Sequence, residues 1–73
     1  MPTDGSGVSY RWIKATVTSG VIKATYQDSD RWRGSRSIRS PACEHWNDSD
    51  IRKATAVALD ITCGASEIEV IRN

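Results

Sequence analysis

The chain of 73 residues contains no phenylalanine, one methionine, two prolines and no long run of apolar residues. A membrane-spanning helix needs about 20 consecutive apolar residues, so none is expected. No basic stretch followed by an apolar one marks the start of the chain, so we expect no signal peptide. With so few large apolar residues, the three tryptophans are expected to supply much of the core volume. We therefore expect one small domain near the lower size limit for independent folding.

Net charge is also small, at +1. A chain with so slight an excess of cations does not bind polyanions through its total charge. The charge is unevenly distributed, however, because residues 31–41 carry four arginines and residues 42–50 carry three acidic residues. Such local asymmetry favours a directed contact surface over general affinity for DNA.

Groups that perform chemistry are few. Cys43, His45 and Cys63 are three potential zinc ligands, but structural zinc sites show paired ligands such as C-x₂-C with a second pair downstream. The single histidine does not define a catalytic Cys–His pair, and no glycine-rich phosphate loop is present. We therefore predict no metal site, no cofactor and no enzymatic activity. We interpret both cysteines as reduced thiols, although a disulfide between them stays open.

The first third of the chain has strand periodicity. Apolar and polar residues alternate over residues 8–17 and again over residues 21–26. Gly20 lies between the two segments and can adopt the positive φ of a tight turn, which predicts a β-hairpin. Tyr10 and Trp12 fall on the face opposite Ile13, where they could be core or contact residues. Residues 1–7 are small and polar, and we expect a disordered lead-in there.

The second half predicts a helix. Asn47 is the expected N-cap with Asp50 three residues later, and apolar residues then recur at helical spacing from Ile51 to Ile61. Gly64 is the expected end of the helix because glycine readily adopts the left-handed conformation.

Residues 67–72 alternate again and predict a final strand with Ile68 and Val70 toward the core. The order β-β-arm-α-β predicts the α+β class, with a small antiparallel sheet of three to four strands and one helix packed on one face. Residues 8–73 then form a single domain.

Residues 28–41, between the hairpin and the helix, form the most basic segment. Gly34 and Pro41 argue against a long regular strand, so we predict a mobile basic arm, with room for a third, edge-type strand from about Arg31 to Ile38. Arginine binds carboxylates and phosphates bidentately, and arginine and tryptophan are enriched at interface hot spots. We predict that a partner contacts this arm and the first strand, through Arg31, Trp32, Arg33, Arg36 and Arg39, and through Tyr10, Arg11 and Trp12. The alternative is a solvated loop whose arginines only balance nearby carboxylates.

Three stretches resemble small phage proteins that inhibit bacterial RNA polymerase: residues 11–17 (RWIKATV), 47–54 (NDSDIRKA) and 68–72 (IEVIR). The resemblance implies a phage-encoded transcription regulator in the host bacterial cytoplasm that is not an enzyme and has no cofactor. It further implies binding to the β′ and β subunits of the polymerase, displacement of the σ factor at initiation, and antitermination. No family motif assigns contact residues, so the site residues above are predicted from composition alone. We expect a monomer.

Two other functions remain open. The arm could bind nucleic acid directly, or the chain could inhibit a different host complex. The small net charge predicts that free duplex DNA is bound more weakly than ~10⁻⁵ M at physiological salt. Nucleic acid would then lie close to the arm only in the complex with the partner.

Overall fold

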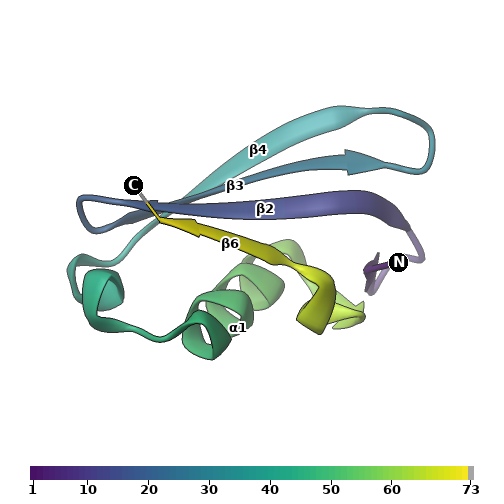
Figure 1. Ribbon diagram of the computed structural model, residues 1–73. Coiled ribbons are helices and arrows are strands. Elements are labelled where there is room, and N and C mark those ends of the chain that lie inside the picture. Colours follow the sequence, from purple (N-terminus) through teal and green to yellow (C-terminus); the bar gives the residue numbers. More distant parts are fainter. Residues whose placement is uncertain (73) are drawn as a thin grey trace.

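The computed structural model describes residues 1–72 and confirms the α+β class. One helix, α1 (Asp48–Leu59), packs against one face of a four-stranded sheet, and Figure 1 shows no helix or strand over the opposite face within the described residues. The strand order is β4-β3-β2-β6. The bounds of these strands are β2 Tyr10–Thr18, β3 Val21–Asp28, β4 Arg33–Arg39 and β6 Glu69–Arg72.

The sheet is mixed. Strands β2, β3 and β4 follow one another as antiparallel neighbours, as the hairpin pattern predicts. The last strand, β6, pairs parallel to β2, with Lys14 opposite Glu69 and Val17 opposite Arg72. The chain returns to β6 through α1, so it arrives beside β2 in the same direction.

The turn between β2 and β3 confirms the predicted hairpin. Ser19 and Gly20 have φ values of 48° and 76°. Positive φ at both central residues of a two-residue turn defines type I′, whose twist matches that of the flanking strands. A β-carbon at Gly20 would also lie 3.1 Å from the Cα atom of Pro41. Glycine therefore satisfies both the backbone and the packing at this position.

Strict alternation fails at the start of β2. The pairing shifts between Tyr10, which faces Asp28, and Trp12, which faces Gln27, so Arg11 is the extra residue of a β-bulge. The bulge turns the Tyr10 side chain to the helix side, where it is 7% exposed and its ring lies edge-on to that of Tyr26 at 5.3 Å. The prediction that Tyr10 shares a face with Trp12 is therefore wrong.

The core lies between α1 and the face of the sheet that it covers, which we call the covered face. Its side chains are mostly aliphatic and come from β2, β3, α1 and the segments that hold Cys43 and Ile68: Tyr10, Ile13, Ala15, Val17, Ile22, Ala24, Cys43, Ile51, Ala56, Leu59 and Ile68. No tryptophan is fully buried, so the expectation that three tryptophans fill the core is wrong. Trp46 packs against its margin, Trp12 lies half-buried on the opposite face, and Trp32 is exposed.

The helix begins where the sequence predicts and ends earlier. The side chain of Asn47 accepts a hydrogen bond of 2.9 Å from the backbone N–H of Asp50, as expected for an N-cap. The helix ends at Leu59 because Asp60 adopts the left-handed conformation, with φ 56°. Gly64 also adopts it, with φ 79°, but it lies after residues 61–63 and does not end the helix. Residues 61–63 instead form strand β5 (Ile61–Cys63), which pairs with β1 (Thr3–Asp4).

Residues 1–7 thus contain a strand, in contrast to the expected disordered lead-in. The carboxylate of Asp4 organises this segment by accepting hydrogen bonds from Ser6, from the Val8 backbone and from the Tyr10 hydroxyl, the last at 3.0 Å. These hydrogen bonds, that of the Ser6 side chain foremost, lower the pKa of Asp4. Burial, together with the hydrogen bond to Asp4, raises the pKa of Tyr10 to about 12.

Candidate binding surface

The predicted basic arm contains a regular seven-residue strand, β4. Gly34 does not interrupt it, because this glycine faces Tyr26 in the register and the tyrosine lies against it. A β-carbon at Gly34 would lie only 2.5 Å from the Tyr26 hydroxyl oxygen. Pro41 follows the strand and begins the short 3₁₀ helix η1 (Pro41–His45). The argument that these two residues prevent a long strand is therefore wrong.

Because side chains alternate along a strand, β4 separates the arginines of the arm. Arg36 pairs with buried Ala24 on the covered side, and its guanidinium donates a hydrogen bond to the carbonyl of Ala58 near the end of α1. The last carbonyls of a helix lack intrahelical partners and carry partial negative charge, so a cation there stabilises the helix. Arg33 and Arg39 point to the opposite side. The five residues of the predicted arm site do not form one surface.

The uncovered side of the sheet, which we call the open face, has four rows of side chains defined by the register of β2, β3 and β4. Each row has one basic residue, so the cations are spread along the strands. The rows are Trp12–Gln27–Arg33, Lys14–Thr25–Ser35, Thr16–Lys23–Ser37 and Thr18–Val21–Arg39.

The fourth strand, β6, extends this face by Glu69 beside Lys14 and by Ile71 beside Thr16. The open face therefore presents four cations and one carboxylate among hydroxyl groups.

Trp12 is the aromatic residue of the open face. Its indole N–H donates a hydrogen bond of 3.1 Å to the side-chain oxygen of Gln27, and the ammonium of Lys14 lies 5.2 Å from the ring centroid. The amide group of Gln27 in turn donates to the backbone carbonyl of Arg31 at 3.4 Å. The ring is half-buried and fixed in orientation, at one end of a surface whose charged side chains are exposed.

The turn between β3 and β4, residues 28–32, forms a second feature that we call the tip. Figure 1 shows it at the end of the sheet opposite to the β2–β3 turn. The carboxylate of Asp28 accepts hydrogen bonds from the backbone N–H groups of Asp30 at 2.9 Å and Trp32 at 2.7 Å. Arg31 has a left-handed backbone, with φ 66°. This network holds the turn in one shape and leaves the Trp32 side chain 69% exposed.

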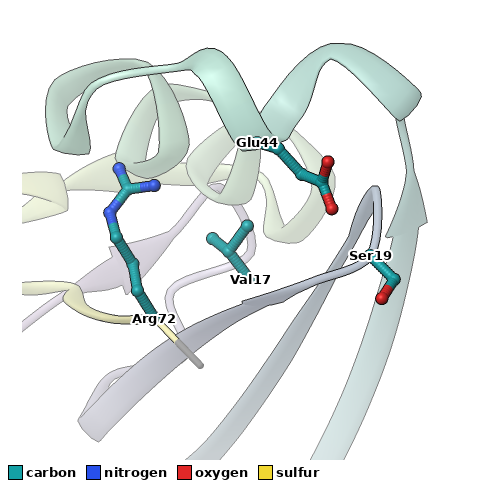
Figure 2. A pocket seen from close by; sticks show the side chains of 4 residues that line it. All are labelled: Val17, Ser19, Glu44 and Arg72. Carbon is teal, nitrogen blue, oxygen red and sulfur yellow. The ribbon is translucent and has the colours of Figure 1, made fainter.

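A small hollow of about 260 Å³ lies near the opposite end of the sheet, lined by Val17, Ser19, Glu44 and Arg72 (Figure 2). Ligand pockets usually enclose about 300–1,000 Å³. The guanidinium of Arg72 is already engaged, with the carboxylate of Asp48 at 2.9 Å and the carbonyl of Trp46 at 2.8 Å. The hollow is therefore smaller than a usual ligand pocket, and the guanidinium that lines it already has its own hydrogen-bond partners. Neither property favours a small-molecule site.

The three potential zinc ligands are not brought together. Cys43 is buried in the core, whereas His45, at the end of the same short helix η1, and Cys63, on β5, are exposed. Both thiols are free. Among residues 1–72, no group of three or more histidine, cysteine, aspartate or glutamate side chains could hold a metal ion. None of the helices described is long and apolar enough to cross a membrane.

Of the eight predicted contact residues, Tyr10 is buried and Arg36 supports the helix, whereas the other six reach the surface. Arg31 and Trp32 belong to the tip, and Arg33, Arg39 and Trp12 to the open face. Arg11 is exposed at the bulge.

Sequence reasoning missed Lys23. It placed Lys14 with Tyr10 and Trp12 on a candidate polar face of the first strand, but not among the predicted contact residues. The signal was available, because both lysines alternate with buried aliphatic residues. Only the strand register shows that they share a surface with the arginines of β4.

No protein-family model matches the chain, and the comparisons with curated proteins and with solved structures also found no match.

Proposed function

We propose that this protein is a non-enzymatic transcription regulator that binds bacterial RNA polymerase, with the tip as a contact element. The observation that carries the proposal is the exposed Trp32 in a turn that is already ordered by its own hydrogen bonds. Tryptophan and arginine dominate the energetics of protein interfaces because they bury large areas and form several polar contacts. Arg31 lies directly beside Trp32 in the same turn.

The order of the turn favours docking. Association loses affinity when loops must be immobilised in the complex. In the tip, two contacts fix the loop before any partner arrives. The Asp28 carboxylate accepts a hydrogen bond from the Trp32 backbone N–H, and the Asp28 backbone N–H donates one of 2.9 Å to the Trp32 carbonyl. The Trp32 ring can therefore enter a pocket on a protein without a large entropic loss.

The choice of polymerase is supported by the resemblance of the hairpin, the helix start and the last strand to small phage inhibitors of this enzyme. In this proposal the chain binds the β′ and β subunits, displaces the σ factor at initiation and favours antitermination. It acts by occupying a surface of a larger machine in the host cytoplasm.

The test is affinity capture of polymerase from nuclease-treated bacterial lysate, followed by binding to the purified enzyme. The tip variant combines Arg31→Gly with Trp32→Ala, since glycine tolerates the positive φ of Arg31 without strain. The control variant combines Lys53→Ala with Val57→Ala, which removes one cation and one exposed apolar side chain from α1.

We expect the wild-type chain and the control variant to recover β and β′, and the tip variant to lose at least about thirtyfold in affinity, as for a hot spot worth ~2 kcal/mol. Equal recovery by the tip variant would show that another surface binds. If the wild-type chain captures a different host complex and no polymerase, the proposed partner is wrong.

A further inference from the structure

The open face has no partner within the described residues, yet its composition is specific. Four basic residues oppose a single carboxylate, Glu69, at one edge. A sheet face exposed only to water has no need for a fixed tryptophan among cations. From this combination we infer that the open face binds single-stranded RNA, independently of the tip and of the polymerase proposal.

Charge complementarity favours a nucleic-acid strand. Successive rows lie two residues apart along the strands, or about 6.6–6.8 Å. Each row contributes one cation: Arg33, Lys14, Lys23 and Arg39. In row order they come from β4, β2, β3 and β4, so they are spread over three neighbouring strands. Because lysine and arginine side chains are long and flexible, such cations can reach several phosphates of one single strand that lies over the sheet.

Trp12 supplies the contact to a base. Proteins that bind single strands stack unpaired bases on aromatic side chains beside a basic groove. The indole of Trp12 is fixed through Gln27, and the Lys14 ammonium beside it is exposed and free to move toward a phosphate when a base approaches the ring. A duplex keeps its bases stacked internally, so it cannot use this contact.

The remaining side chains favour RNA over DNA. Between the cations lie hydroxyl groups, two on each of the two middle rows: Thr25 and Ser35 on one, Thr16 and Ser37 on the other. A ribose 2′-hydroxyl is both donor and acceptor, and it allows a protein to distinguish RNA from DNA. A serine or threonine hydroxyl can satisfy it in either sense.

The test measures fluorescence anisotropy of the full chain with labelled RNA of mixed sequence, about eight nucleotides long, within the roughly 4–16 that small single-strand modules cover. The matched probes are single-stranded DNA and duplex DNA of the same sequence. We expect RNA to bind below ~10⁻⁴ M at physiological salt, and more tightly than either DNA probe. No RNA binding in this range, or equal binding of duplex DNA, would overturn the inference. Equal binding of single-stranded DNA would overturn the assignment to RNA.

Two variants locate the site. Trp12→Ala should weaken RNA binding at least about fivefold, the lower limit for loss of one base stack. Because Trp12 is half-buried, this change could also disturb the fold, so Lys23→Ala provides an independent measure at an exposed position.

The logarithm of the affinity falls as the logarithm of the salt concentration rises, and Lys23→Ala should make this fall shallower. The slope should decrease in magnitude by about 0.7, the value for one phosphate of a single strand. Lys53→Ala, on the outer side of α1, is the matched control and should leave the slope unchanged. The same slope change in both lysine variants would show that binding is not on the open face. Lys23→Ala should still capture polymerase, so the two proposals can fail separately.

Discussion

The two faces of the central sheet are made by the same strands, whose side chains alternate everywhere except at the β-bulge of Arg11, and the faces differ in almost every property. On β3, Ile22 and Ala24 are fully buried beneath α1, whereas Lys23 between them is exposed. The covered face is aliphatic and closely packed, and the open face carries cations, hydroxyl groups and one fixed indole ring. The comparison indicates that stability resides on one face and recognition on the other.

Small size makes this division useful. A domain of this length buries only about 60% of the surface of its unfolded chain, so it has little stability to lose. Side chains on the open face can then be selected for binding without weakening the core, because they point away from it. The division predicts different consequences for substitutions at adjacent positions.

The sharpest test is at two neighbours on β3. Ile22→Ala should lower the free energy of unfolding by about 2–5 kcal/mol, because it removes buried methyl groups and leaves a cavity in the covered face. Lys23→Ala should change it by less than ~0.5 kcal/mol, as for an ordinary surface position. Chemical denaturation measures both.

If Ile22→Ala leaves no folded protein to measure, Ile22→Val provides a milder change of about 0.5–1.5 kcal/mol. Similar losses at Ile22 and Lys23 would contradict the division between the faces.

A second pair of substitutions compares neighbouring positions on β4. Gly34→Ala should destabilise the fold by about 1–3 kcal/mol, because the new methyl group would collide with the Tyr26 ring packed against the strand. Ser35→Ala, one residue later on the open face, should be nearly neutral for stability. Thermal unfolding followed by circular dichroism distinguishes the two. A neutral Gly34→Ala would mean that Tyr26 can move aside without loss.

The third and smallest effect separates two arginines of the same strand. Arg36→Ala should lower stability by about 0.3–1 kcal/mol, since it removes the cation from the end of α1. Arg33→Ala should leave stability unchanged but weaken RNA binding. Denaturation and anisotropy on both variants measure the contrast. If Arg36→Ala weakened RNA binding as much as Arg33→Ala does, the two side chains would share a surface after all.

Local sequence was sufficient for much of the fold. The alternation of β3 and of β2 from Trp12 onward, the glycine of their turn and the asparagine N-cap each depend on residues close together in the chain, and the structure confirms all three. The end of the helix was predicted wrongly because Asp60 adopts the left-handed conformation and the residues after it pair with the N-terminal segment. Such pairing depends on residues far apart in sequence.

The candidate site was predictable only in part. Composition identified the four arginines and the one tryptophan of residues 31–39, and Trp32 is indeed exposed. Composition could not show that Arg36 turns to the helix or that the β-bulge at Arg11 buries Tyr10. Both outcomes depend on the strand register, and a shift by one residue moves a side chain to the other face.

The sequence by itself determined the hairpin, the start of the helix, the last strand and the segregation of basic residues between the hairpin and the helix. Tertiary structure decided what that basic segment became. Pairing with β3 made it a strand, strand alternation divided its arginines between two faces, and the register placed Arg33 and Arg39 beside Lys23. The physical reason is that propensity and periodicity act between near neighbours. A shared surface is formed by hydrogen bonding between strands that the sequence keeps apart.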